Sequence, residues 1–150
     1  MKKSQTLILA IGNRMRGDDA IGCVIADELK RIDGLLVIDA GTVPENFIEK
    51  ICELKPKRII IVDACDFKGQ PGSFRIFSER QMEKITGHLI STHTLSLNLT
   101  VAMIKKQLDC RVQLLGIQPE RIDFGTALSP KVNQAKDRVV KYLLGLVTKT

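Results

Sequence analysis

Three near-continuous apolar runs limit the folds that are open to this chain. They cover residues 6–11 (TLILAI), 35–39 (LLVID) and 58–64 (RIIIVDA). Strands buried on both faces of a parallel sheet have this pattern, whereas strands with one solvated face alternate apolar and polar residues. Stretches with apolar residues at helical spacing separate the runs, so the first part of the chain predicts a β-α-β-α-β unit with right-handed crossovers.

The rest of the chain predicts two more strands. Residues 73–77 (SFRIF) follow the turn-rich segment FKGQPG and alternate, which indicates a short antiparallel strand at the sheet edge. Residues 110–117 (CRVQLLGI) indicate another buried strand. We therefore expect an α/β fold, a three-layer α/β/α sandwich around a mostly parallel sheet of about five strands.

Helix starts are marked by local signals. Ser78 and Gln81 have the spacing of a capping box, and Ser129 followed by Pro130 predicts the N-cap and first turn of the final helix. Pro44 suits the first turn of a helix that carries an apolar face to residue 54, and a longer helix is expected to start near residues 91–92.

The composition excludes several classes of protein. A chain of 150 residues predicts a single domain over residues 1–150, and no apolar stretch reaches the roughly 20 residues needed to span a bilayer. The net charge is +6, but the basic residues are spread out and aromatics are only 4%, so no nucleic-acid partner is expected. The four cysteines form no C-x-x-C pair, which favours buried, reduced thiols and a cytoplasmic protein.

Acidic residues follow several of the predicted strands. Because ligands bind at the carboxyl ends of parallel strands, we expect these residues to lie along one functional edge. A histidine in STHT joins them if the long helix starts at the same edge. The residues expected there are Asp18, Asp19, Asp39, Asp63, Asp66 and His93.

The stretch GNRMRGDDAIG, residues 12–22, admits three interpretations. A phosphate cradle is disfavoured because its glycines are five residues apart and two aspartates occupy the helix start. Asp18 or Asp19 can instead cap the helix, and Asp39 and Asp63 can be polar strand ends. The third interpretation is a metal site, since two carboxylates and one imidazole can hold a divalent transition metal with coordination positions left open.

Two other chemistries have weaker support. Ser91 and His93 are near neighbours, but the chain lacks a G-x-S-x-G elbow. Cys65 follows Asp63 closely, but an apolar neighbourhood raises the pKa of a thiol and disfavours it as a nucleophile.

The motifs GNRMRGDDAIG, DAGTVPE, IIIVDA with a following PG, ISTHTLSL and LLGIQP occur in an order that resembles the maturation endopeptidases of nickel–iron hydrogenases. The likeness is strongest to the hydrogenase-3, formate-hydrogenlyase type, and it covers nearly the whole chain. It implies a cytoplasmic enzyme that removes the C-terminal extension of a hydrogenase large-subunit precursor after nickel insertion.

The resemblance also implies roles for particular residues. Asp19, Asp63 and His93 correspond to the metal-contacting and catalytic groups, and the segment Asp39, Ala40, Gly41 and Thr42 corresponds to a substrate-recognition loop. The family pattern is broken at Ala20, where glycine is common, and at NRM, where Pro-Leu is common. Neither departure removes a proposed ligand.

The resemblance implies that nickel arrives bound to the precursor, although other divalent metals can occupy such a site in vitro. The metal can polarise the scissile carbonyl, activate a water, or serve only for recognition. A monomer is expected. The alternatives are a nickel-dependent checkpoint protein that binds the precursor without cutting it and, with less support, a nucleotide-binding module.

Overall fold

One five-stranded sheet organises the molecule. The computed structural model describes residues 5–85 and 94–148. The strand order is β2-β1-β3-β5-β4, and only β4 runs antiparallel to its neighbour. The mostly parallel sheet with one antiparallel edge strand confirms the sequence prediction. The strands are β1 (Thr6–Ala10), β2 (Leu36–Asp39), β3 (Arg58–Ala64), β4 (Phe74–Ser78) and β5 (Arg111–Ile117).

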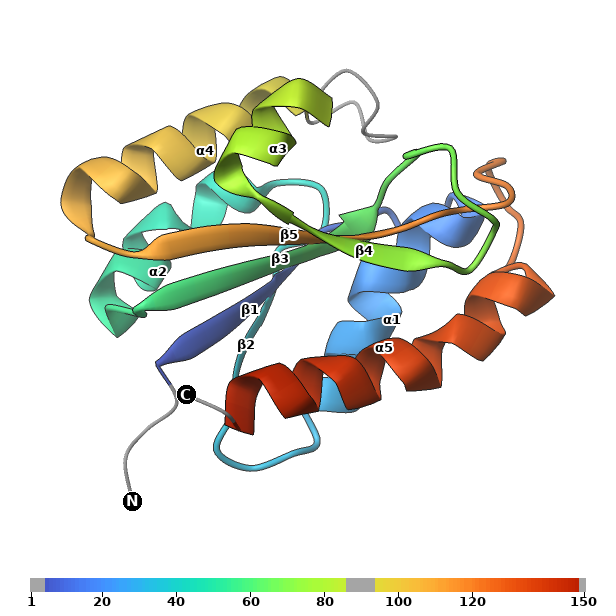
Figure 1. The fold of residues 1–150 in the computed structure, drawn as a ribbon, viewed down its shortest axis with the longest axis horizontal. Helices are drawn as coiled ribbons and strands as arrows, with labels where there is room; N and C mark the ends of the chain where they lie inside the picture. Colours follow the sequence, from blue (N-terminus) through green and yellow to red (C-terminus); the bar gives the residue numbers. More distant parts are fainter. Residues whose placement is uncertain (1–4, 86–93, 149–150) are drawn as a thin grey trace.

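Helices cover both faces of this sheet (Figure 1). One layer consists of α1 and α5, and the other contains α2, α3 and α4. Short 3₁₀ turns, η1 and η2, precede α1 and α2. The expected three-layer α/β/α arrangement is therefore confirmed. The bounds are η1 (Gly17–Ala20), α1 (Ile21–Leu29), η2 (Pro44–Phe47), α2 (Ile48–Leu54), α3 (Glu79–Ile85), α4 (Thr94–Gln107) and α5 (Pro130–Thr148).

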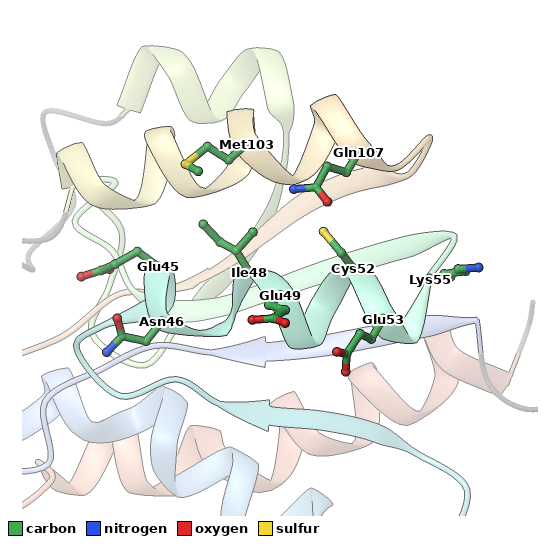
Figure 2. Close-up of a pocket in the computed structure, with 9 residues that line it drawn as sticks. All are labelled: Glu45, Asn46, Ile48, Glu49, Cys52, Glu53, Lys55, Met103 and Gln107. Carbon is green, nitrogen blue, oxygen red and sulfur yellow. The ribbon is translucent and has the colours of Figure 1, made fainter.

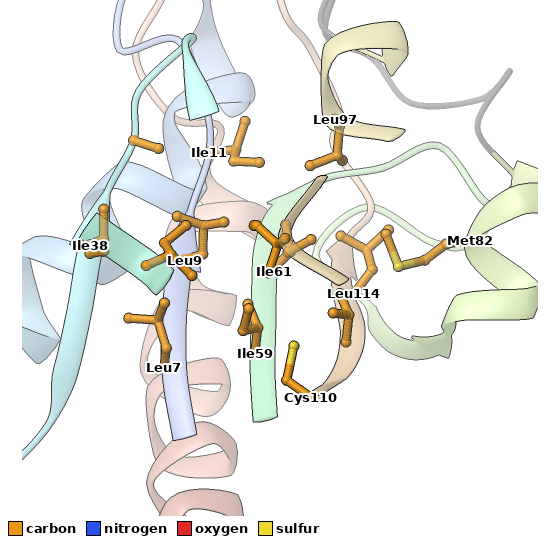
Figure 3. Packing of buried hydrophobic residues seen from close by; sticks show 14 of the residues in the cluster. Leu7, Leu9, Ile11, Ile38, Ile59, Ile61, Met82, Leu97, Cys110 and Leu114 are labelled. Carbon is orange, nitrogen blue, oxygen red and sulfur yellow. The ribbon is translucent and has the colours of Figure 1, made fainter. Parts of the chain in front are cut away.

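Alternate side chains of the central strands build two separate cores. Leu7 and Leu9 of β1 and Ile61 of β3 pack with residues of α2, α3 and α4. Figure 3 shows them in one cluster with Met82 of α3 and Leu97 of α4. Ile8 and Ile60, one residue away, pack against α1 and α5. Successive side chains of a strand point to opposite faces, so strands covered on both sides must be apolar at nearly every position. This explains the uninterrupted apolar runs of the sequence.

Two of the local sequence predictions for helices are confirmed, and one is wrong. The capping box is formed, because Ser78 N donates to Gln81 Oε1 at 2.8 Å and Gln81 N donates to Ser78 Oγ at 3.3 Å. Pro44 begins η2 as expected. Leu54, predicted to lie on the buried face of its helix, is 38% exposed at the end of α2. No helix in the described ranges is both long and apolar enough to cross a membrane.

Candidate active site

The loop between β1 and α1 lies pressed against the ends of two strands. A Cβ atom on Gly12 would lie 2.3 Å from the carbonyl oxygen of Asp19. One on Gly22 would lie 2.4 Å from the carbonyl oxygen of Ile11 and 2.6 Å from that of Val62. Both positions therefore require glycine, and the close packing brings η1 against the carboxyl ends of β1 and β3. The two glycines that bound the sequence motif therefore have a packing role.

Asp18 is a structural residue in this loop. Its carboxylate is fully buried and accepts four hydrogen bonds: from the backbone N–H groups of Glu120, Arg121 and Ser129, and from Ser129 Oγ, at 2.7–3.0 Å. It caps neither η1 nor α1, because no side-chain hydrogen bond caps either helix. The helix-cap interpretation is therefore wrong for Asp18. Its carboxylate ties the first loop to the segment between β5 and α5.

The same bonds change the interpretation of Ser129. Pro130 is the first residue of α5, so the predicted helix start is confirmed. The Ser129 hydroxyl, however, donates to Asp18 Oδ2 at 2.8 Å. The sequence signal thus located the helix correctly, although the recorded side-chain bond of Ser129 is a long-range contact to the first loop.

Asp63, near the end of β3, accepts fewer hydrogen bonds on its carboxylate than Asp18 does. It is fully buried, and its Oδ1 atom accepts one hydrogen bond, from Ala64 N at 2.8 Å. No donor from the described part of the chain reaches Oδ2. Burial and the nearby charge of Asp19 raise the pKa of Asp63 well above its ordinary value, against the smaller opposing effect of the Ala64 hydrogen bond. The fold therefore holds this carboxylate where ionisation is costly.

Asp19 provides the second carboxylate of this pair. It is 1% exposed, and its charge acts on Asp63. Two buried carboxylates that interact unfavourably either share a proton or bind a cation between them. Their oxygen atoms can serve as two ligands of a divalent metal. Among the described residues, no group of three or more His, Cys, Asp or Glu side chains forms a metal cluster.

His93, the third predicted member, lies outside the described residues. It immediately precedes Thr94, the first residue of α4. Leu97 of α4 packs in the same core as Ile61. Asp63 is two residues after Ile61 along the strand, so its side chain is directed to the face that α4 covers. Asp63 therefore faces the layer that contains α4, and the role of His93 stays a prediction.

The segment Asp39–Thr42 lies on a groove of about 430 Å³. Gly41 takes a positive φ of 57°, and its carbonyl accepts a hydrogen bond from Gly12 N at 2.9 Å, which couples this segment to the first loop. All four predicted substrate-contacting residues line the groove, beside three apolar side chains. The lining includes Asp39, Ala40, Gly41, Thr42, Met15, Val43 and Phe47.

Asp39 ends β2, and its side chain is directed to the opposite face of the sheet from that of Asp63. Ile38 packs in the α2–α4 core, so the next side chain is directed to the α1 face. There Arg14 Nη2 donates to Asp39 Oδ2 at 2.7 Å, and the same guanidinium binds both carboxylate oxygens of Asp27. Burial opposes ionisation of Asp39, but hydrogen bonds from Arg14, Cys23 and Gly41 outweigh it, so the pKa of Asp39 is lowered.

The sequence reasoning missed this role of Arg14, because NRM was noted only as a departure from the family pattern. An arginine in a loop next to a glycine-rich strand end carries no local signal for its partner. Asp27 and Asp39 are 13 and 25 residues away, and only the tertiary fold brings them to one guanidinium.

The aspartates at this edge of the sheet therefore have different surroundings. Asp66 is a turn residue whose pKa is lowered by hydrogen bonds from Lys68 N and the Gln118 side chain. Only Asp19 and Asp63, among the described aspartates of this edge, form an interacting pair of buried carboxylates. The five described aspartates lie at or follow the carboxyl ends of the parallel strands, as predicted, but Asp18, Asp39 and Asp66 are each bound by other partners.

The cysteines fit the interpretation as small apolar residues. All four are free thiols. Burial and the charges of Asp63 and Asp66 raise the pKa of Cys65 to about 12, which leaves very little nucleophilic thiolate at neutral pH. The environment of Cys65 therefore opposes thiol catalysis, as expected.

Comparison with known proteins agrees with this geometry. The family model for hydrogenase maturation proteases matches residues 23–146. The hydrogenase 3 maturation protease of Escherichia coli K12 is 33% identical over 93% of this chain and 88% of its own length.

Solved structures show the same relationship. The [NiFe] hydrogenase maturation protease of Thermococcus kodakarensis is 30% identical, with a TM-score of 0.83, and the match covers 97% of this chain and 94% of that one. An Escherichia coli endopeptidase has a TM-score of 0.79 at 32% identity, over 93% and 89% of the two chains. The family model covers well over half of this chain, and relatives at least 30% identical align with more than nine-tenths of it, so this chain belongs to the hydrogenase maturation protease family and is a peptidase.

Proposed function

We propose that this enzyme is an endopeptidase that removes the C-terminal extension of a nickel–iron hydrogenase large-subunit precursor after nickel insertion. Nickel bound to the precursor is the feature that it recognises. The observation that carries this proposal is the buried pair of carboxylates, Asp19 and Asp63, at the carboxyl end of the sheet. The relatives are named for hydrogenase maturation, which gives the substrate class.

A divalent cation would relieve the repulsion between the Asp19 and Asp63 carboxylates. Ionised Asp63 faces the charge of Asp19 and has one hydrogen bond within the described residues. A bound cation would remove this repulsion and would use the Asp63 oxygen that now lacks a donor from the described chain. We assign Asp19, Asp63 and His93 as the residues that hold the metal, with His93 included on its family correspondence.

A site of this composition favours metal that arrives on the substrate. It has two carboxylates and one imidazole but no thiolate, so it binds free nickel modestly. A precursor whose own cysteines carry nickel offers the ion with open positions that Asp19, Asp63 and His93 can fill. The precursor then binds tightly only when loaded, which makes metal insertion a checkpoint through differential affinity.

Each part of this chain has a separate task in the reaction. Asp19 and Asp63 fix the metal-bearing segment of the precursor against β1 and β3. Nickel supplies a Lewis acid that polarises the scissile carbonyl when it is bound there. The Asp39–Thr42 segment contacts the polypeptide beside the cleavage point, and the Arg14 ion pair keeps Asp39 ionised for that contact. We further propose that the enzyme is monomeric and acts in the cytoplasm.

The decisive experiment follows trimming of purified precursor by mass spectrometry. The precursor is supplied loaded with nickel, loaded with zinc or empty, with no free metal added. We expect the nickel-loaded form to lose a C-terminal peptide and the empty form to remain intact. Efficient cleavage of the empty precursor would contradict recognition of nickel, and cleavage of none of the three would contradict the proposed substrate.

A further inference from the structure

A second groove lies between α2 and α4, away from the carboxylate pair. Its volume is about 670 Å³. Figure 2 shows Ile48 and Cys52 on the side of α2 that faces Met103 and Gln107 of α4. The groove is therefore bounded by two helices of one layer, and its floor is partly apolar.

Acidic side chains follow one wall of this groove. Glu45, Glu49 and Glu53 recur every four residues along η2 and α2, and all three are exposed. None of them forms an ion pair with any residue that the structure describes. Lys55 is the one basic residue of the lining, so the groove carries a negative charge on a chain whose net charge is +6. This excess of acidic side chains favours a basic partner.

The apolar surface next to the acidic row is also unusual. Met103 is 42% exposed, and Leu99, four residues earlier on α4, is 62% exposed. Residues four apart lie on the same side of a helix. Exposed methionine and leucine side chains beside an apolar groove are typical of surfaces that receive the apolar face of a helix.

The groove adjoins the substrate loop. Val43 and Phe47 line the groove of the Asp39–Thr42 segment, whereas Glu45 and Asn46 line the second groove. The short turn η2 therefore forms a wall of both grooves. A polypeptide that contacts the Asp39–Thr42 segment can continue over η2 into the space between α2 and α4.

We propose that the α2–α4 groove docks a basic, amphipathic segment of the precursor at a distance from the scissile bond. The proposal rests on the proposed function, because it names the precursor as the partner. The three glutamates attract the basic residues of this segment, while Ile48, Met103 and Leu99 receive its apolar face. Docking here adds affinity for the whole precursor without touching the reacting atoms.

The test compares two variants with the same loss of charge. The E45Q/E49Q/E53Q variant removes three carboxylates from the groove. The E28Q/D33N/D137N variant removes three from α1, the loop after it and α5, in the opposite layer. With nickel-loaded precursor, we expect the groove variant to raise KM about tenfold with kcat unchanged, since three surface ion pairs are lost. The control variant leaves KM within twofold of the wild-type value by the same reasoning.

Two further measurements test whether the precursor docks in the α2–α4 groove. M103S is expected to raise KM, whereas I32S, which changes an exposed isoleucine beyond α1, is not. Hydrogen exchange of the enzyme with bound precursor should show protection in η2, α2 and α4.

Equal KM values for the two triple variants, or protection confined to the sheet edge, would overturn the docking proposal while leaving the proposed function intact. Failure of the wild-type enzyme to cleave any loaded precursor would instead overturn the proposed function and the docking proposal with it.

Discussion

Asp18 and Asp63 are both fully buried carboxylates at the same edge of the sheet, yet the fold treats them in opposite ways. Asp18 accepts four hydrogen bonds and connects two loops. Asp63 accepts one, and besides burial the charge of another acid, Asp19, opposes its ionisation. The first arrangement stabilises the folded chain, and the second costs stability. We infer that a ligand which needs both carboxylates accounts for a fold that keeps one costly carboxylate beside another.

The largest expected effect is loss of activity on replacing Asp63. Asp63→Asn keeps the shape of the side chain but removes a negative charge that a divalent cation requires. We expect cleavage of the nickel-loaded precursor to fall to background, while circular dichroism shows a folded protein. Asp66→Asn, which changes a partly buried aspartate that follows the same strand, should cleave normally. Substantial cleavage by the Asp63 variant would remove this residue from the site.

The second expected effect is a loss of stability at Asp18. Asp18→Asn places an amide where four donors converge, so one or more buried N–H groups lose their acceptor. We expect the free energy of unfolding to fall by about 3 kcal/mol. Cleavage per folded molecule should stay close to the wild-type value at a temperature where the variant is folded.

Urea denaturation and initial-rate measurements on the same samples separate the two quantities. A stable but inactive Asp18 variant would show that Asp18, rather than Asp19, belongs to the site.

The third effect is a dependence of stability on pH, and its sign follows from the raised pKa of Asp63. The pKa of Asp63 is raised in the folded state, so the folded protein holds this proton more tightly than the unfolded chain. Its contribution to stability is complete below the ordinary aspartate pKa of about 4 and is lost as the pH rises through the folded-state pKa.

Asp63→Asn should therefore be more stable than the wild type above that range, with a difference that shrinks toward low pH. The free energy of unfolding across a pH series, with metal removed by a chelator, tests this. If the stability of the variant relative to the wild type grows as the pH falls, the pKa of Asp63 is lowered in the folded state and not raised.

A smaller effect is expected at Arg14. Arg14→Gln removes the charge that holds Asp39, and the pKa of Asp39 should rise, as an NMR titration of its side-chain carboxyl would show. Because Arg14 is half exposed, its loss should change stability by about 1 kcal/mol or less. We expect a raised KM with little change in kcat. An unchanged KM would show that the Asp39 contact does not depend on this ion pair.

The smallest effect is expected at Cys65. Its thiol is buried, and its pKa of about 12 leaves it protonated at neutral pH. Cys65→Ser should therefore lower stability modestly and leave cleavage intact. A folded Cys65→Ser variant that binds precursor but does not cut it would replace the metal-site account with thiol catalysis.

The apolar strands were predictable from the sequence, whereas the different roles of the two aspartates in GDD were not. Apolar runs such as residues 58–64 report directly on burial from both faces, so the sheet and its antiparallel edge strand were predictable. The two acids of GDD look alike in sequence, because nothing local shows that Ser129, 111 residues away, binds Asp18. The family resemblance selected Asp19 over Asp18, and the four hydrogen bonds of Asp18 became visible only in the structure.

We infer that Asp63 is held in place for a metal that the precursor brings. Affinity measured for four pairs, wild type and Asp63→Asn each with nickel-loaded and empty precursor, tests this most directly. The wild type should prefer loaded precursor by about tenfold or more, a coupling typical of linked binding sites. The variant should bind both forms with the weaker affinity. A variant that keeps the full preference for loaded precursor would contradict the central claim.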